Sequence, residues 1–327
     1  MYFAFALVAL LCWSGSDLFS KKGTDEKDPN SHWKVTFAVG LIMGIHFLIT
    51  LVGGAIIDAN GGPDVLPKFV SSLFYTDFKL IDFIYYLPVA ALYIFAMVLG
   101  YIGLRYIELS ISSPICNCSG SLALLLCVLI FPLIGAEPVE LNLLSIIGVI
   151  AITLGIIGVG IVDNKENPEL KVLRRTQSNR KYTKSVLALL LPIAYLIIDA
   201  LGTVGDEVFF HFVDISDYSA NSSFELTFFL LAIFSFIWIK AVKKDKLFVK
   251  KGSAIYLGGL CETIGQVFYM AVMFADYEIG MPIISAYCVV SVLWSRIFLK
   301  EKLSIYHYLT IGVTIAGIIL LGIFSPV

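Results

Sequence analysis

Ionisable residues interrupt long apolar stretches of this 327-residue chain, and four of them could carry chemistry. Glu262 lies about ten residues into its stretch, or about 15 Å along a helix, and Asp199, Asp17 and His46 interrupt other stretches. An unpaired charge in hydrocarbon costs about 3 kcal/mol or more, so each group must be neutral, paired or hydrated. These residues could bind a proton or a cationic ligand. They could also form structural pairs: Glu262 with His46, or Asp17 with Lys21, four residues later in the chain.

Polar side chains in three of the apolar stretches recur at helical spacing, so each set shares one helix face. The sets are Tyr195, Asp199, Gly202 and Asp206; Glu262, Gln266 and Tyr269; and Ser113, Asn117 and Ser121. Because polar groups facing lipid are costly, we expect these faces to point into a bundle. Asn117 and Gln266 could equally join neighbouring helices by hydrogen bonds.

Aromatic residues accompany these faces and could surround a cationic group, although ordinary packing explains such residues as well. They are Trp13, Tyr86, Tyr93, Tyr195, Tyr269 and Tyr287. The predicted substrate- or proton-binding residues are Glu262, Asp199, His46, Asp17, Gln266, Asn117, Tyr269, Trp13, Tyr93 and Tyr195.

Motifs of enzymes are missing from the sequence, which holds no Walker loop, no His-Glu-x-x-His and no glycine-rich dinucleotide signature. All six cysteines fall in apolar stretches, and Cys116 and Cys118 are two residues apart, which places them on different helix faces. We therefore predict no enzyme, no cofactor and no metal site. Nucleic-acid binding is not supported either, because the basic stretches adjoin apolar ones.

The composition indicates an integral membrane protein. Hydrophobic residues make up 58% of the chain and charged residues 15%, with a mean hydropathy of +0.89; soluble domains hold about 25% charged residues. A helix that spans the hydrocarbon needs about 20 mostly apolar residues. Ten stretches qualify: about 2–20, 34–57, 81–104, 111–134, 141–162, 185–205, 222–240, 253–274, 281–299 and 304–324. The predicted fold is all-α, with ten transmembrane helices.

The two halves of the chain repeat one pattern. Tyr101–Pro114 and Tyr269–Pro282 each run 13 residues from tyrosine to proline, and Ile111 matches Ile279. Glu137 and Glu301 each lie eleven residues before a glycine in Ile-Gly-Val. We predict a first five-helix repeat over 1–162, a basic cytoplasmic linker over 163–184 and a second repeat over 185–327.

Basic residues are concentrated in alternate connections. Numbered from the first helix, the odd connections hold 21 of the 23 Lys and Arg residues, and the even ones hold only Lys68 and Lys79. The positive-inside rule places the odd connections in the cytoplasm and both termini outside, in a multi-pass protein of a plasma membrane, bacterial by this interpretation. Because five is odd, the second repeat enters from the opposite face, so the repeats are inverted, as in many secondary transporters.

The chain resembles the drug/metabolite transporter superfamily, in particular its EamA-like members. Phe298-Leu-Lys-Glu301 before a glycine-rich last helix and the run from Tyr269 to Pro282 are similar to family patterns, as is Trp13-Ser-Gly-Ser16. The sixth helix departs from the family by lacking a tryptophan at the matching place. The resemblance implies that helices five and ten form a scaffold, with the others around a central cavity. Glycines 148, 155, 158, 312, 317 and 322 suit close packing of that scaffold.

These features together predict a secondary-active transporter of a small metabolite, an amine, quaternary ammonium or amino acid, working by alternating access. Expected partners are the substrate, the lipid bilayer and a coupling proton or ion, with the protein a monomer or a homodimer. No Lys or Arg lies in the middle of a predicted span, which weighs against the first alternative, a nucleotide-sugar carrier of an organelle. A receptor or lipid-handling protein is the second alternative, and no soluble domain or catalytic set supports it.

Overall fold

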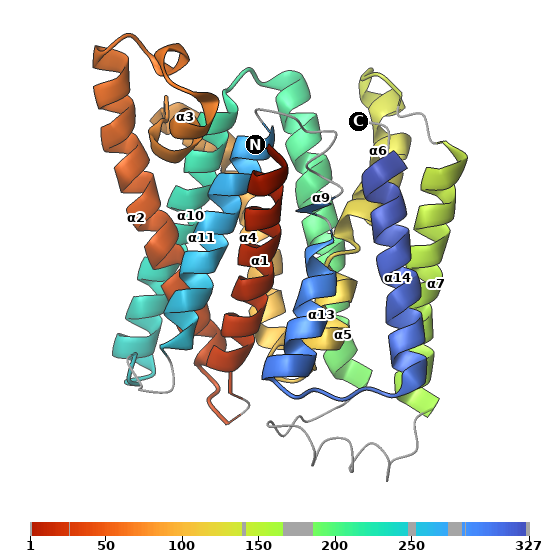
Figure 1. Cartoon of the computed structure of the whole chain (residues 1–327). Coiled ribbons are helices and arrows are strands. Elements are labelled where there is room, and N and C mark those ends of the chain that lie inside the picture. Colours follow the sequence, from red (N-terminus) through yellow and green to blue (C-terminus); the bar gives the residue numbers. More distant parts are fainter. Residues whose placement is uncertain are drawn as a thin grey trace.

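The apolar stretches fold as helices, because a backbone surrounded by hydrocarbon must pair its N–H and C=O groups within its own segment. In the computed structural model the described residues are 2–25, 27–138, 142–165, 186–247, 253–273, 283–284 and 286–324, and within these ranges there is no strand. The helices stand side by side in one bundle, and the first residues of α1 and the last of α14 lie at the same end (Figure 1).

The first half of the chain supplies one helix of every main helix pair. In order it forms α1 Tyr2–Gly23, α2 Ser31–Ala59, the short turn η1 Pro63–Val65, α3 Lys68–Phe74, α4 Leu80–Gly103, α5 Leu109–Cys116, α6 Ser119–Ile134 and α7 Leu143–Lys165.

The second half supplies the partners. It forms the turn η2 Val186–Leu189, α9 Leu190–Phe212, α10 Asp217–Ile237, the π-helical turn η3 Trp238–Val242, α11 Ala254–Met273, α13 Tyr287–Phe298 and α14 Ile305–Phe324. The pairs are α1 with α11, α4 with α9, α2 with α10, α7 with α14 and α5 with α13.

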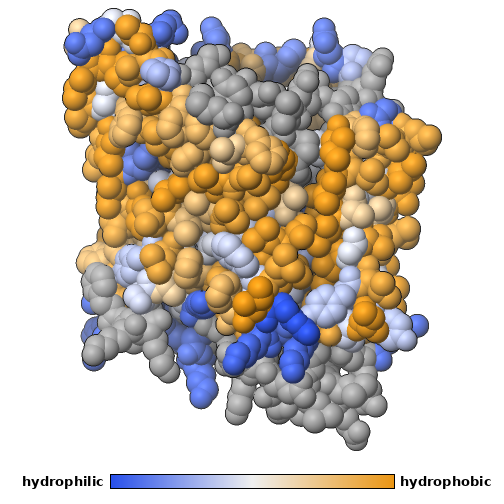
Figure 2. Space-filling view, in the orientation of Figure 1, coloured by the Kyte–Doolittle hydropathy of each residue, from blue (hydrophilic) through white to orange (hydrophobic). Residues whose placement is uncertain are grey.

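Eight segments of the described chain are long and apolar enough to cross a membrane. A hydrophobic band crosses the face seen in Figure 2, and polar residues gather toward the two ends of the bundle. The two other predicted spans differ: α9 carries Asp199, Asp206 and Glu207, and α13 has only 12 residues. The described residues therefore form an all-helical bundle consistent with a membrane protein, and ten crossings in two inverted repeats remain a prediction.

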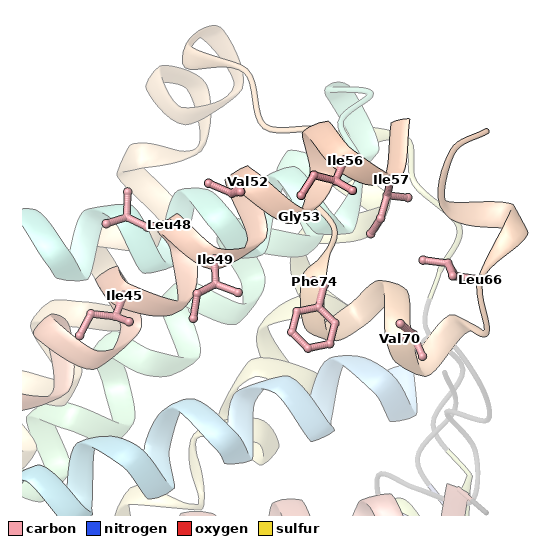
Figure 3. Close-up of a pocket in the computed structure, with 10 residues that line it drawn as sticks. All are labelled: Ile45, Leu48, Ile49, Val52, Gly53, Ile56, Ile57, Leu66, Val70 and Phe74. Carbon is pink, nitrogen blue, oxygen red and sulfur yellow. The ribbon is translucent and has the colours of Figure 1, made fainter. Parts of the chain in front are cut away.

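Two features of the first half were not predicted. The span predicted over 111–134 is divided into α5 and α6 at Asn117 and Cys118, just after Pro114, whose ring removes a helical hydrogen bond. The connection between α2 and α4 contains α3, which lies across the end of the bundle beside α2. An apolar pocket of about 620 Å³ lies between them (Figure 3), and no carboxylate lines it.

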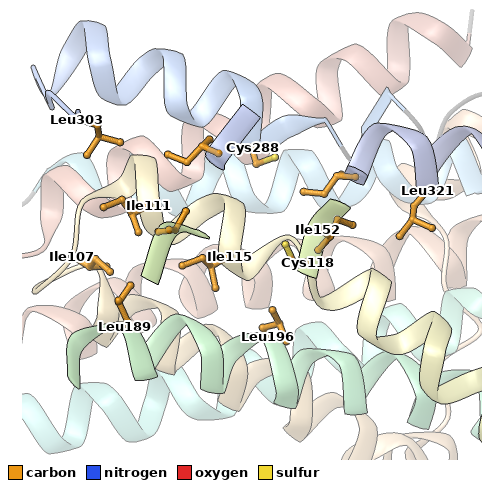
Figure 4. Close-up of a cluster of buried hydrophobic side chains, with 13 residues drawn as sticks. Ile107, Ile111, Ile115, Cys118, Ile152, Leu189, Leu196, Cys288, Leu303 and Leu321 are labelled. Atoms are coloured by element: carbon orange, nitrogen blue, oxygen red, sulfur yellow. The ribbon is translucent and has the colours of Figure 1, made fainter. Parts of the chain in front are cut away.

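The bundle interior is filled mainly by aliphatic side chains from helices of both halves. One cluster joins Ile111 and Ile115 of α5 to Leu196 of α9, Cys288 of α13 and Ile152 of α7 (Figure 4). These residues are nine-tenths or more buried. The cluster ties α5 and α13, which carry two of the polar side chains described below, to the α7–α14 pair.

The α7–α14 pair is close because glycines face backbone across it. A Cβ atom at Gly317 would lie 2.7 Å from the carbonyl oxygen of Gly148, and Thr314 occupies the space beside Gly155. The close packing predicted for these glycines is therefore observed. The prediction was wrong for Gly312, because nothing lies within 4 Å of the place where its Cβ would be.

Replacing Gly317 by Ala should lower the apparent unfolding temperature of the purified protein, measured by scanning fluorimetry in detergent. Overpacking of this kind costs about 1–3 kcal/mol. The matched control is Gly312→Ala on the same helix, which adds the same methyl group to open space and gains up to about 1 kcal/mol of helix propensity. Equal destabilisation by the two variants would contradict the close backbone contact between α7 and α14.

Candidate functional site

Asp17 lies on α1 at the point where α5 and α13 meet it. Its Oδ2 atom accepts hydrogen bonds from the Ser113 hydroxyl of α5 at 2.6 Å and the Ser291 hydroxyl of α13 at 2.8 Å. Both serines are buried, and neither was predicted as a binding residue. The ion pair of Asp17 with Lys21, one of the two interpretations of the sequence, is wrong, because hydroxyls take its place.

Two further carboxylates lie in the interior near Asp17. The Ser16 hydroxyl on α1 approaches Glu262 of α11, and Asp17 is close enough to repel Glu262 electrostatically. Asp199 of α9 is approached by the Ser119 hydroxyl of α6. The central carboxylates, as we call Asp17, Asp199 and Glu262, are therefore held by hydroxyl groups from neighbouring helices.

The aromatic side chains lie around these carboxylates. Trp13 lies 5.3 Å from Tyr269 and 5.9 Å from Tyr287 between ring centroids. Tyr287 and Tyr195 both lie within electrostatic range of Glu262. This partly matches the predicted aromatic set, because three of its six members meet in one wall. Tyr86 is elsewhere, since its hydroxyl donates to Asp206 at 2.8 Å.

Tyr93 and Asn117 lie next to this centre on other helices. The ring of Tyr93 on α4 packs against Gly202 of α9, where a Cβ atom would lie 3.1 Å from it. Asn117 stands at the junction of α5 and α6, one turn after Ser113. All ten predicted site residues are half-buried.

The central carboxylates have no counter-cation among the described residues. The ion pairs found there are Lys34 with Asp28, Lys34 with Asp245, and His46 with Glu225, and none includes a central carboxylate. Two donors nearby also lack acceptors: the indole N–H of Trp13 and the hydroxyl of Tyr101 are buried without a hydrogen-bond partner. The centre thus combines carboxyl groups that lack a cationic partner among the described residues with donors that lack acceptors.

His46 and Gln266 belong to a second group of residues. The Nδ1 atom of His46 lies 2.8 Å from Oε1 of Glu225 on α10, so the structure corrects the predicted partnership of His46 with Glu262. Asn221 donates to the same oxygen of Glu225 at 3.2 Å and accepts from Gln266 of α11 at 3.0 Å. Gln266 thus joins two helices, as one interpretation of the sequence expected.

Glu225 is the main residue that sequence reasoning missed. It is fully buried, although it lies near the start of a run whose first residues are polar. Its spacing of four from Asn221 was the available signal, since the two share one helix face. Asn221 also begins an Asn-Ser-Ser sequon, and its place inside α10 makes that sequon unsuited to glycosylation.

Buried charges hold one end of the centre. Lys21, at 0% exposure, donates to the carbonyl oxygens of Leu104 and Ile107 just after α4. Glu301 accepts from the backbone N–H groups of Leu109 and Ser110 at the start of α5, both at 3.0 Å. We call this arrangement the α4–α5 clamp, because it fixes the turn between these helices.

A further polar link lies near the same end. Lys34 of α2 contacts Asp28 at 2.7 Å and Asp245 at 2.8 Å, which joins the connections that follow α1 and η3. The hydrogen bond from Lys34 holds the pKa of Asp245 below its usual range. At the other end, Phe69 of α3 stacks on Phe5 of α1 with ring centroids 4.4 Å apart.

Comparison with known proteins gives a family match for the second half of the chain. Residues 186–323 match the model of the EamA-like transporter family, which belongs to the drug/metabolite transporter superfamily. The resemblance predicted from the sequence is thereby confirmed. The match indicates a membrane transporter, and the family is one of transporters rather than enzymes.

A solved structure titled "Crystal structure of protein" is similar over 98% of this chain and 96% of its own, with a TM-score of 0.50 and 16% identity. At that identity the likeness concerns the fold alone. No match was found among curated proteins.

Replacing Lys21 by Met should destabilise the protein, because carbonyl groups at the end of α4 would lose a charged donor. A buried acceptor left unsatisfied costs about 1–3 kcal/mol. The neighbouring residue supplies a matched control, since Lys22→Met removes the same charge from a half-buried side chain. Scanning fluorimetry of both variants should show a clear loss only for Lys21→Met, and equal losses would contradict the clamp.

Proposed function

We propose that this protein is a secondary-active transporter that moves a small cationic metabolite, such as an amine or a quaternary ammonium, by alternating access. The observation that carries the proposal is the group of central carboxylates. Asp17 and Glu262 lie inside the bundle, accept only hydroxyl hydrogen bonds and meet no cation among the described residues. An amino acid fits the same centre through its ammonium group.

The charge balance of the centre favours a cation. A buried carboxylate without a partner is costly in a membrane interior, and a bound cation would remove that cost. The wall formed by Trp13, Tyr269 and Tyr287 offers ring faces to such a group, and cation–π contacts contribute about 0.5–2 kcal/mol each. The buried N–H of Trp13 could donate to a hydroxyl or carboxylate elsewhere on the substrate.

Two inverted five-helix repeats, 1–162 and 185–327, would supply the moving parts, with 163–184 as the linker between them. The packing supports this division. If each helix is exchanged for the helix at the same position in the other repeat, the pair α1–α11 becomes α9–α4. The pairs α2–α10, α7–α14 and α5–α13 are unchanged by the exchange. Inverted repeats of this kind rock about a site near the middle of the membrane in known transporters.

We further propose a plasma-membrane location, with both termini outside and the basic connections in the cytoplasm. The distribution of Lys and Arg supports this orientation. It places the α4–α5 clamp at the cytoplasmic end and α3 at the outer end. Substrate entry would then require the clamp or the aromatic contact of Phe5 with Phe69 to open in turn.

The site can be tested by binding of choline, putrescine and leucine to the purified protein, with scanning fluorimetry and calorimetry. We expect binding of at least one of the three, because each carries an ammonium group. Glu262→Gln and Asp17→Asn keep the shape and remove the charge, and each should weaken binding tenfold or more, about 1.4 kcal/mol. Glu207→Gln is the matched control, since Glu207 is exposed on α9.

Two results would contradict the assignment. Binding that is unchanged in both Glu262→Gln and Asp17→Asn would show that the ligand lies elsewhere. Tight binding of UDP-glucose, an anionic probe, with none by the three ammonium compounds would favour the nucleotide-sugar alternative.

The orientation has its own test. A fluorescent protein that matures only in the cytoplasm, fused to the C-terminus and expressed in bacterial cells, should stay dark. The same protein inserted in the connection between η3 and α11 should be bright. A bright C-terminal fusion would reverse the orientation and favour the organelle carrier, while leaving the inversion of the repeats in place.

A further inference from the structure

The hydrogen-bond geometry of His46 limits where its protons can lie. Its Nε2 atom is 3.2 Å from the carbonyl oxygen of Leu73, at the end of α3. A carbonyl oxygen can only accept, so Nε2 carries a hydrogen. The contact of Nδ1 with Oε1 of Glu225, at 2.8 Å, requires another proton, either on the ring or on the carboxyl group. In both cases the His46–Glu225 pair is neutral overall and holds one proton between Nδ1 of His46 and Oε1 of Glu225.

The contact with His46 provides a partner for a carboxyl group that has few others. Glu225 has no exposed surface, and its Oε2 atom is buried without a hydrogen-bond partner. Loss of the shared proton would leave a carboxylate with one unsatisfied oxygen and with the ring lone pair facing the other. Such a state is stable only where water or another partner reaches Glu225, so release of the proton requires the surroundings to change.

We propose that His46 and Glu225 form the proton-binding site that couples transport to a proton gradient, as a dyad separate from the central carboxylates. The inference rests on the proposed function, since coupling presupposes transport. The proton enters from one side of the membrane, is shared by Nδ1 and Oε1, and leaves to the other side. No bond other than those to this proton changes.

The position of the dyad connects it with both the moving parts and the substrate centre. His46 lies on α2 and Glu225 on α10, a helix pair that joins one proposed repeat to the other. Asn221 and Gln266 extend the hydrogen bonds from Glu225 to α11. Gln266 lies one helical turn after Glu262, so a shift of α11 moves the central carboxylate and the end of this network together.

Other titratable groups on the surrounding elements have partners of their own. Asp82 of α4 accepts from Ser219 at 2.9 Å, and Asp77, in the connection before α4, accepts from Ser216. Asp58 of α2 interacts with Tyr75, which follows α3, and Asp206 of α9 accepts from Tyr86. Among the described residues, Glu225 is the charged group that contacts His46.

The test measures protons and substrate in the same proteoliposomes. The probe is whichever of choline, putrescine and leucine the wild type transports, supplied as a gradient, and a trapped pH-sensitive dye reports proton movement. The wild type should move a fixed number of protons per probe molecule. In Glu225→Gln and in His46→Gln this ratio should fall to zero, and a pH gradient should no longer drive accumulation. The matched control is Glu207→Gln combined with His211→Gln, both exposed on α9, which should keep the wild-type ratio.

The other possible results separate the coupling proposal from the proposed function. An unchanged proton ratio in either folded variant overturns the proposal, and the second variant serves where the first fails to fold. A wild type that transports the probe without protons also overturns it, while the proposed function stands. A wild type that moves none of the three probes contradicts the proposed function, and the coupling proposal falls with it. Glu262→Gln separates the roles, since it should reduce movement of the probe itself.

Discussion

The α4–α5 clamp fixes the register of the interior. Helix ends leave backbone groups unpaired, and these are costly where water is excluded. Lys21 satisfies the carbonyl groups of Leu104, which caps α4, and of Ile107. Glu301 satisfies N–H groups at the start of α5. Each charge therefore interacts favourably with the dipole of the helix end that it faces. Lys21 lies one turn after Asp17, and Ser113 lies one turn after Ser110. The clamp therefore fixes α1 against α5 so that Asp17 and Ser113 meet.

The placement of the clamp also explains the charge of the centre. Lys21 is used at a helix end and His46 beside Glu225, so neither neutralises Asp17 or Glu262. Serine hydroxyls compensate the burial of a carboxylate only in part, because a hydrogen bond to a charged group contributes about 1.5–3 kcal/mol while burial of an ion costs several kcal/mol. A centre of this kind gains most from a ligand that brings its own positive charge. Lys21 and His46 thus have structural partners, and Asp17 and Glu262 keep no cationic partner among the described residues.

Most of the fold could be predicted from the sequence, and the site only in part. Hydropathy locates nearly every helix, and acids inside apolar runs identify Asp17, Asp199 and Glu262, because both signals are local. The partner of His46 was not predictable in this way, since Glu225 is 179 residues away and the pairing depends on how α2 and α10 pack. Ser291 was missed, and Ser113 was placed on an inward face without a binding role, because buried serines in membrane helices usually bond to their own backbone. The division of α5 from α6 shows the same limit, since Pro114 predicts a disturbed helix without giving its new direction.

The two polar groups occupy equivalent kinds of place in the bundle. Helix α11 packs on α1 and α2, and α4 packs on α9 and α10, which gives two sets of three helices. Backbone contact is close within the first set, where a Cβ atom at Gly259 would lie 2.8 Å from the carbonyl oxygen of Ala38. It is also close between the sets, where a Cβ atom at Gly40 of α2 would lie 2.3 Å from the carbonyl oxygen of Phe228 of α10. The dyad of His46 and Glu225 joins the two sets directly, and Asp17 reaches across to Ser113 on α5, which packs against α9. Relative motion of the two proposed repeats would disturb the contact of His46 with Glu225 and that of Asp17 with Ser291, since each joins a residue of 1–162 to one of 185–327. Binding a cation at one group or a proton at the other would therefore change the free energy of that motion.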